Sequence, residues 1–305
     1  MFLYLPVALT SINSLIPVGI GLSVGLLSGL FGVGGGWIIT PFLMMVGISP
    51  TVAAATGATQ MVAASASGAY AHWKLGNVDI KMGIYLVIGS FLGGMLGVEA
   101  IKILMALGNA DFVIRMTYVL MLGIVGTYMF IESLSSMMKK KSEEVKIEKE
   151  SKMAKFLKSL PLQTHFKESG VTHSVPAIIL LGSLVGILAA IMGVGGGFIM
   201  VPMMLYLLRM PMHVVVGTSL FQILLTCIEV TFLQAYTNHT VDFILAVILS
   251  LGATIGAQIG TAFGRKLKAD QLKILLAGLV LAVAVKMIFE LTLSPSILLE
   301  QAGGH

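Results

Sequence analysis

The chain has 305 residues, of which 57% are hydrophobic and only 11% are charged. A soluble domain carries about a quarter charged residues, so this composition excludes an ordinary globular protein. The single cysteine, Cys227, excludes an intrachain disulfide and a cysteine-based metal cluster. The formal net charge of +5 is concentrated in loops of the cytoplasmic type, which favours positive-inside sorting over nucleic-acid binding.

Apolar segments follow one another along the chain, and several are long enough to cross about 30 Å of hydrocarbon. The sequence therefore predicts an all-α membrane protein with many spans. The expected segments are 14–31, 37–46, 51–71, 80–104 and 112–134 in the first half, and 175–192, 198–209, 212–236, 241–264 and 270–292 in the second.

A charged segment, 136–172, separates the two halves and holds nine lysines and five glutamates. We interpret it as a solvated cytoplasmic linker. The predicted domain organisation is a first transmembrane repeat at 1–135, the linker at 136–172 and a second transmembrane repeat at 173–305.

The two halves repeat a pattern of glycines and prolines. Later in each half, Asp79 and three glycines recur at an offset of 163 as Asp242 and three further glycines. So many matches at nearly one offset indicate a duplicated unit. The positions that recur 161 residues later are Gly32, Gly34, Gly35, Gly36, Pro41 and Pro50, as Gly193, Gly195, Gly196, Gly197, Pro202 and Pro211.

Basic residues predict how the halves are oriented. If 175–209 crossed the membrane once, Arg209 and the basic residues at 265–273 would lie outside, against the positive-inside rule. If 175–192 and 198–209 instead enter and return to one face, these charges fall inside. Each repeat then has a broken re-entrant helix pair plus three transmembrane helices, and the two repeats have inverted topology. This architecture is typical of transporters with a substrate site near the midplane.

The sequence "GVGGG", at 32–36 and again at 193–197, predicts a helix break in each repeat. A returning half-helix presents bare N–H groups and a partial positive charge at its start, which favours an anion. Close helix packing is the alternative explanation, but three adjacent glycines and a following proline favour a site. The candidate substrate-binding residues here are Gly34, Gly35, Gly36 and Trp37, with Gly195, Gly196 and Gly197.

The next helix of each repeat supplies uncharged polar groups suited to the oxygens of a small anion. Bonding of Ser and Thr to the carbonyl four residues earlier is the alternative for any one of them. Taken together beside the glycines, they favour a polar lining. The candidates are Thr56, Thr59, Gln60 and Ser65 in the first half, and Thr218, Ser219, Gln222 and Thr226 in the second.

Glu229 is a charged residue inside an apolar segment, where a functional role is the default expectation. It is a candidate for proton coupling, by co-transport or counter-transport. A carboxylate facing an outer vestibule is the other interpretation, and both stay open here. The G-x-x-x-G-x-x-x-G stripes at Gly89 to Gly97 and Gly252 to Gly260 predict close helix packing.

The sequence contains no Walker loop, H-E-x-x-H motif or Ser/His/Asp constellation. We therefore expect no enzyme activity, no metal site and no cofactor. Its intramembrane carboxylates are too sparse for the rings of a cation channel.

Several motifs are similar to those of one known family. "LFGVGGGWIITPFL", "SGAYAHWKLGNVD", "AAIMGVGGGFIMVPMML" and "VVGTSLFQ" resemble the sulfite exporter TauE/SafE family over nearly the whole chain outside the linker. The resemblance implies a two-repeat helical transporter of small sulfur-containing anions in the cytoplasmic membrane. The matched positions are Gly34 to Gly36, Gly195 to Gly197, Thr59, Gln60, Thr218 and Ser219. In the second repeat "TNHTVD" replaces "LGNVD", which departs from a symmetrical use of the two loops.

The predicted function is thus secondary transport of sulfite, sulfoacetate or another organosulfonate across the inner membrane. The anion would bind at the midplane between half-helix N-termini and Ser, Thr and Gln groups, with alternating access. The alternatives are a channel-like anion pore, a transporter of thiosulfate or sulfate, and a membrane assembly protein that acts through the linker. The expected partners are the anion, a proton and membrane lipid, with no nucleic acid.

Overall fold

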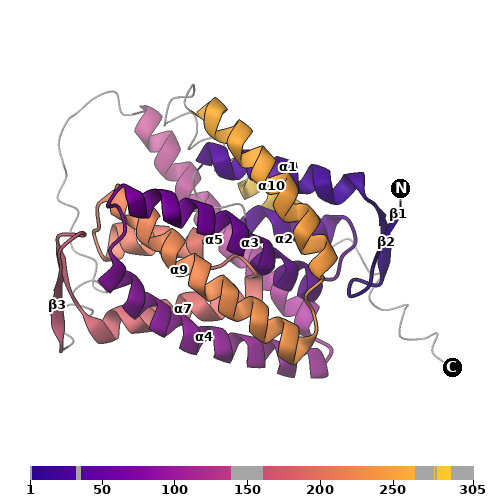
Figure 1. Cartoon of the computed structure of the whole chain (residues 1–305), viewed down its shortest axis with the longest axis horizontal. Helices are drawn as coiled ribbons and strands as arrows, with labels where there is room; N and C mark the ends of the chain where they lie inside the picture. Colours follow the sequence, from indigo (N-terminus) through magenta and orange to yellow (C-terminus); the bar gives the residue numbers. More distant parts are fainter. Residues whose placement is uncertain (1, 32–35, 139–160, 265–277, 279, 290–305) are drawn as a thin grey trace.

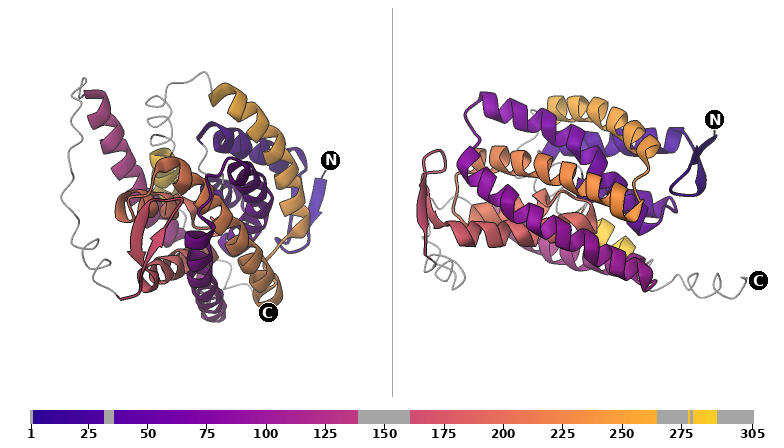
Figure 2. Two further views of the ribbon diagram at one scale, coloured as in Figure 1. Left: turned by 60° about the vertical axis from the view of Figure 1, so that its left-hand side comes forward. Right: turned by 60° about the horizontal axis from the view of Figure 1, so that its bottom comes forward.

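The computed structural model describes residues 2–31, 36–138, 161–264, 278 and 280–289. Its long helices run along the molecule, and a β-hairpin lies at each end (Figure 1; Figure 2). The hairpins pair β1 (Phe2–Leu5) with β2 (Thr10–Asn13), and β3 (Gln163–Phe166) with β4 (Val171–Ser174). We call the end with β1 and β2 the N-terminal end, and the end with β3 and β4 the linker end.

The helices agree closely with the apolar segments expected from the sequence. The first half contains α1 (Leu15–Phe31), α2 (Gly36–Met45), α3 (Pro50–Lys74), α4 (Ile80–Ala106) and α5 (Ala110–Met138). The second half contains α7 (Val175–Met192), α8 (Gly197–Pro202), the π-helical turn η1 (Met203–Leu207), α9 (Met212–Leu233), the π-helical turn η2 (Gln234–Asn238) and α10 (Phe243–Gly264), followed by a helix at Val280–Phe289.

Within the described residues, five helical stretches are long and apolar enough to cross a membrane. The prediction of an all-α membrane protein is therefore confirmed. Between the spans, local chemistry sets the helix starts: Asp79 accepts from the backbone N–H of Met82 at 2.9 Å, and Asp242 accepts from that of Leu245 at 3.1 Å. The five stretches are Ile80–Ala106, Ala110–Thr127, Val175–Met192, Met212–Asn238 and Phe243–Gly260.

The two hairpins were not expected from the sequence. They recur at the same offset of 161 as the glycine clusters, so the duplicated unit begins before its first helix. The second hairpin falls within 136–172, and its Phe166 and Ser169 are buried. This last part of the expected linker therefore forms a hairpin that is anchored on the bundle by Phe166 and Ser169, while most of its other residues are exposed. Residues 139–160 lie outside the described part of the chain.

Glycines bring helices of the two repeats into close contact, as the glycine stripes predicted. α4 packs along α7, and α1 packs along α10 in the same way. A Cβ added at Gly93 would lie 1.9 Å from the carbonyl oxygen of Ser183, and one at Gly25 would lie 2.1 Å from that of Ala253. No side chain larger than glycine fits at either crossing.

Two aspartates connect the repeats at opposite ends. At the linker end, Asp79 accepts from the N–H and the hydroxyl of Ser169, between β3 and β4, while its own N–H donates to Thr218 in α9. The starts of α7 and α9 therefore lie at the same end of the bundle. At the N-terminal end, Asp242 accepts from two N–H groups between β1 and β2 and donates to Thr56 in α3. The starts of α1 and α3 therefore also share an end.

Candidate functional site

The helix break between α7 and α8 lies inside the protein. α7 ends at Met192, Gly193 caps it with a φ of 68°, and α8 begins at Gly197. Residues 193–198 are all buried. Since non-helical backbone at membrane depth must be covered by protein or line a cavity, this burial suits a break within a bilayer.

Conformation and space both require the glycines of this break. Gly195 has a φ of 67° and Gly196 a φ of 77°, in the left-handed region that favours glycine. An added Cβ would lie 2.6 Å from the sulfur of Cys227 at Gly195, and 2.1 Å from Cγ1 of Val185 at Gly196. Neighbouring side chains thus occupy the space in front of both glycines. This adds a packing role to the ligand approach expected from the sequence.

The first repeat places the start of α2 against the same break. An added Cβ at Gly36 would lie 2.8 Å from the Met61 side chain, near the middle of α3, and 3.2 Å from the carbonyl oxygen of Val194. Trp37 and Phe198, which occupy the same position in the two repeats, stack with ring centroids 5.3 Å apart. The starts of α2 and α8, each with N–H groups that lack an intrahelical acceptor, therefore lie close together.

Of the predicted glycines, Gly34 and Gly35 lie outside the described residues. Gly36, Gly195, Gly196 and Gly197 are buried around the stacked rings of Trp37 and Phe198. The described part of the predicted glycine set is thus gathered in one place.

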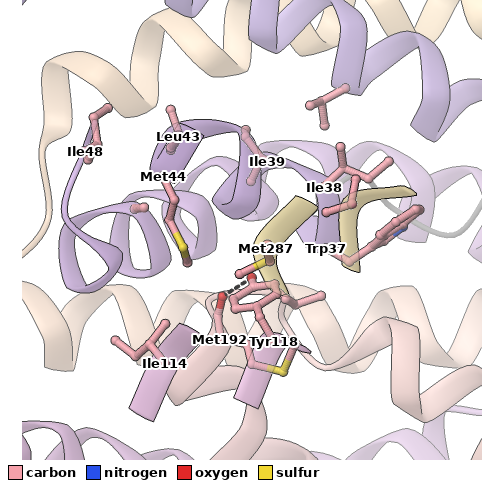
Figure 3. Close-up of a cluster of buried hydrophobic side chains, with 14 of the residues drawn as sticks. Trp37, Ile38, Ile39, Leu43, Met44, Ile48, Ile114, Tyr118, Met192 and Met287 are labelled. Atoms are coloured by element: carbon pink, nitrogen blue, oxygen red, sulfur yellow. Dashed lines mark hydrogen bonds between the residues drawn. The ribbon is translucent and has the colours of Figure 1, made fainter. Parts of the chain in front are cut away.

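Two hydroxyl groups of the first repeat cover the last carbonyl group of α7. Tyr118 donates to the carbonyl oxygen of Met192 (Figure 3). Thr40 donates to the same oxygen at 3.4 Å. The C-terminal end of a helix carries partial negative charge, which would repel an anion. These two bonds cover that negative end next to the start of α8.

Thr56 and Thr218 are engaged at the ends of the bundle. The N–H of Asp242 donates to Thr56 Oγ1 at 3.2 Å, and the N–H of Asp79 donates to Thr218 Oγ1 at 2.9 Å. Both threonines are fully buried. Their hydroxyls join the two repeats in this structure.

Three other predicted lining residues bond to their own helix. Thr59 donates to the carbonyl oxygen of Ala55 at 3.0 Å, and Ser65 donates to that of Met61 at 2.6 Å. Ser219 donates to the carbonyl oxygen of Val216 at 3.0 Å. Bonding to the carbonyl four residues earlier, the alternative given by the sequence, therefore describes Thr59 and Ser65 in this state, whereas Ser219 bonds to the carbonyl three residues earlier.

Gln60 and Gln222 retain unused hydrogen-bonding capacity. The Oε1 atom of each is buried and has no hydrogen-bond partner among the described residues, while Gln222 Nε2 donates to Thr226 Oγ1 at 2.8 Å. A buried acceptor left unpaired costs about 1–3 kcal/mol. These two amides, one from each repeat, are therefore the places in the predicted lining where a ligand or water would add most stability.

The Glu229 carboxylate lies between α9 and α4. Both of its oxygens are buried without a partner among the described residues, and Oε2 would lie 2.9 Å from a Cβ added at Gly94. About one helical turn away, the hydroxyls of Ser90 and Thr226 are 2.7 Å apart. Because an unpaired buried charge is costly, this position favours a carboxyl group that binds a proton or another cation.

Sequence reasoning missed several polar contacts. Asp79 and Asp242 were recognised as matching positions, but their partners are 90 and 235 residues away along the chain. Ser90, Thr40 and Tyr118 resemble ordinary residues of apolar helices, and no local spacing marks them. Only the duplicated aspartates gave a signal that could have been followed.

Within the described residues, two half-helix starts meet around the stacked rings of Trp37 and Phe198. The unpaired amide oxygens of Gln60 and Gln222 belong to α3 and α9. Helix starts of this kind attract small anions through backbone dipoles and N–H groups.

A family model described as "Sulfite exporter TauE/SafE" matches residues 18–287. A probable membrane transporter protein of Bacillus subtilis, YunE, is 29% identical over 285 residues, covering 90% of this chain and 96% of that protein. A second B. subtilis probable membrane transporter protein, YjnA, is 26% identical and covers 88% of this chain and 97% of its own. Sulfite exporter TauE/SafE family protein 1 of Arabidopsis thaliana is 31% identical over 103 residues, which is 33% of this chain and 23% of that protein.

No solved structure matches this chain. The family model nevertheless covers both glycine clusters, both aspartates and the whole central site, and the curated relatives are described as membrane transporters. With the family model spanning most of the sequence, the resemblance seen in the motifs is confirmed: this chain belongs to the sulfite exporter TauE/SafE family and is a membrane transporter rather than an enzyme.

Proposed function

We propose that this protein is a secondary transporter of a small sulfur-containing anion: sulfite, sulfoacetate or another organosulfonate. Family membership supports the substrate class. The observation that carries the mechanism is the buried meeting of the α2 and α8 starts around Trp37 and Phe198. An anion there would be held by helix dipoles and N–H groups rather than by a lysine or arginine.

The proposed architecture is a pair of inverted repeats, each with a re-entrant helix pair. Asp79 supports this, because it contacts both the hairpin before α7 and the second turn of α9. The chain then starts α7 at the linker end and comes back to that same end after α8, before α9 begins. Asp242 makes the matching contacts for α1 and α3 at the opposite end. Reciprocal contacts of this kind are expected of two repeats related by a two-fold axis in the membrane plane.

In this arrangement the linker end faces the cytoplasm. The segment between α5 and β3 carries eight lysines, and positive charge is retained inside. At the same end, Lys74 is the last residue of α3, Lys81 lies in the first turn of α4 and Arg209 lies between η1 and α9. The site would be reached alternately from the two faces as the repeats rock against one another.

At the midplane, the anion would lie between the two half-helix starts, with Gln60 and Gln222 on either side. Their unpaired amide oxygens support this placement, because a side-chain amide can rotate to offer its NH2 group to a ligand. The polar lining of Thr59 and Ser219 would add hydroxyl donors once their bonds within the helix are exchanged. Binding through dipoles and uncharged donors predicts tolerance among –SO₃ groups.

Glu229 is the proposed coupling residue. It lies in the half of α9 nearer the N-terminal end, and its carboxylate oxygens have no hydrogen-bond donor among the described residues. The hydroxyls of Ser90 and Thr226 lie between it and the middle of the bundle. Binding of a proton there would remove an unpaired charge from the transport path. A proton gradient could then drive the anion by co-transport or counter-transport.

The test is uptake by purified protein in sealed proteoliposomes. Labelled sulfite, sulfoacetate, taurine, thiosulfate and sulfate are supplied separately, with and without a pH gradient. We expect saturable uptake of one or more –SO₃ compounds, accelerated by the gradient. Preference for thiosulfate or sulfate would move the assignment to another oxyanion, flux that neither saturates nor responds to the gradient would indicate a channel, and no movement of any sulfur anion would refute the proposal.

A further inference from the structure

The two inter-repeat aspartates form a matched pair of contacts that the transport site itself does not require. Asp79 precedes α4 and Asp242 precedes α10, and each uses one carboxylate oxygen to cap the helix that follows it. Each uses the other oxygen to hold the turn of the hairpin that precedes the opposite repeat. Each backbone N–H donates to a threonine near the start of α3 or α9 in that opposite repeat.

At the linker end, the contact consists of short bonds to buried groups. Asp79 Oδ2 lies 2.5 Å from the hydroxyl and 3.2 Å from the N–H of Ser169, and the bond to Thr218 is 2.9 Å long. Asp79 and Ser169 are both buried. Asp79 therefore joins α4 of the first repeat to the second repeat in two ways: its carboxylate binds the turn between β3 and β4, and its backbone N–H binds α9.

At the N-terminal end, Asp242 Oδ2 accepts from the N–H groups of Val7 and Ala8 at 3.2 and 3.4 Å. Its own N–H lies 3.2 Å from Thr56 Oγ1. This contact joins α10 of the second repeat to β1–β2 and α3 of the first. The linker-end contact has the same pattern with the roles of the two repeats exchanged.

Both contacts are closed at the same time in this structure, and each crosses the boundary between the repeats at one end only. If the repeats rock as proposed above, access from one face requires the contact at that face to open. We propose that Asp79 and Asp242 are reciprocal gates: the Asp79 contact closes the path at the linker end, and the Asp242 contact closes it at the N-terminal end. This inference rests on the proposed alternating access and adds the residues that control it.

The native Cys227 provides a reporter for gate opening. It is fully buried, against Gly195 at the helix break, and it is the chain's single cysteine. The experiment measures its labelling by a membrane-impermeant maleimide, without substrate, in sealed vesicles of each orientation. The variants Asp79→Asn and Asp242→Asn keep the size of the side chain but leave one acceptor oxygen, so that the N–H donors of the helix and of the hairpin cannot both be satisfied.

We expect slow labelling of the unmodified protein from both faces. Asp79→Asn should raise the labelling rate about fivefold to tenfold from the linker end alone, and Asp242→Asn should do so from the N-terminal end alone, as loss of one or two hydrogen bonds predicts. Thr117→Val is the matched control, because within the described residues the Thr117 hydroxyl donates to Val113 of its own helix, α5. It should leave both rates unchanged.

Milder variants cover the case in which an aspartate variant fails to fold. Ser169→Ala removes the hydroxyl bond to Asp79 but leaves the α4 cap intact, and Thr56→Val removes the acceptor for Asp242. Each should raise labelling from its own end by a smaller factor. Equal labelling from both faces, reversed sidedness, or unchanged labelling in folded variants would overturn the gate assignment. Because the assay contains no substrate, failure of the sulfur-anion proposal would leave these results unaffected.

Discussion

The α4–α9 interface and its counterpart between α10 and α3 occupy equivalent places in the two repeats, but they differ in polarity. In the first, the hydroxyls of Ser90 and Thr226 are 2.7 Å apart and Glu229 lies about one turn further along α9. The equivalent residues in the second interface, at offsets of 163 and 162, are Ala253, Ala64 and Ser67. One interface thus carries a polar path with a carboxylate, and the other does not.

The comparison distinguishes positions that are alike in both repeats from positions that differ between them. Positions that are alike in both repeats, such as Asp79 and Asp242 or Gly93 and Gly256, hold helices and hairpins in place. Positions that differ, above all Glu229, provide chemistry that is needed once. Coupling to a proton requires one titratable group in the path, whereas opening at two faces requires two gates.

The largest effect is expected where the repeats are alike. Gly93→Ala and Gly25→Ala each force a Cβ to about 2 Å from a backbone carbonyl oxygen of the neighbouring helix. Both should destabilise the protein by about 3 kcal/mol or more, because backbone cannot move aside as a flexible side chain does. Thermal unfolding in detergent measures the loss.

Gly123→Ala is the control for these variants. A Cβ there meets nothing within 4 Å, so its stability should change by less than about 1 kcal/mol. If only one of Gly93→Ala and Gly25→Ala lowers stability strongly, the α4–α7 and α1–α10 crossings are not equivalent in the two repeats.

The second prediction addresses the residue that makes the interfaces different. Glu229→Gln keeps the shape of the side chain but cannot bind a proton, so uptake driven by a pH gradient should fall about tenfold or more towards the rate without a gradient. Initial uptake rates in proteoliposomes, with and without the gradient, measure this ratio. Glu99→Gln is the control, since Glu99 is exposed and paired with Lys102 at 3.2 Å. Persisting gradient dependence in Glu229→Gln would remove Glu229 from the mechanism.

The third prediction tests the polar path itself. Thr226→Val removes the hydroxyl that contacts both Ser90 and Gln222, so that Gln222 Nε2 loses its acceptor while Ser90 keeps its bond to the carbonyl oxygen of Val87. We expect a loss of about 1–3 kcal/mol in unfolding free energy and a weaker response to the pH gradient. Thr254→Val, which removes an exposed hydroxyl bonded within α10, should change neither. If Thr226→Val changes neither the unfolding free energy nor the response to the pH gradient, the polar path contributes little to stability or coupling.

The smallest effect is expected at the stacked rings where the two repeats meet. Trp37→Phe should lower stability and raise the half-saturating substrate concentration only slightly, because the stack retains two aromatic rings worth about 0.5–1.5 kcal/mol. Adding Phe198→Trp exchanges the two residues between the repeats. If the double variant regains the original stability and half-saturating concentration, the aromatic pair matters rather than the residue at either position. If it does not, Trp37 has a specific role at its own position.

Much of the fold could be predicted from the sequence because helix length and apolarity are local properties. The starts of α4, α7 and α9 were expected within about two residues, as single-sequence reasoning allows for long apolar elements. The hairpins could not be predicted, because β1 and β3 are only four residues long and share little composition. Their position is explained by Asp242 and Asp79, which bind them from distant parts of the chain.

The candidate site was predictable in part for the same reason. Gly195 and Gly196 stand out in any apolar segment, and they do adopt the left-handed conformations that break a helix. Residue spacing could not predict that Thr56 and Thr218 bond to the two aspartates at opposite ends of the bundle. Nor could it predict that the amide oxygens of Gln60 and Gln222 are unpaired among the described residues. Which hydroxyl bonds within its helix and which crosses to another repeat depends on the neighbour that packing supplies.

The sequence by itself determined the membrane helices, the duplication at an offset of 161 and the family, because these follow from composition and from order along the chain. Only the tertiary structure decided that Asp79 meets Ser169 and that Asp242 meets the N-terminal hairpin. It also decided that Trp37 lies on Phe198 and that Glu229 has no partner among the described residues. Such contacts form between residues far apart in the chain, and hydrophobic patterning sets which helix face is buried without fixing which buried polar group it meets.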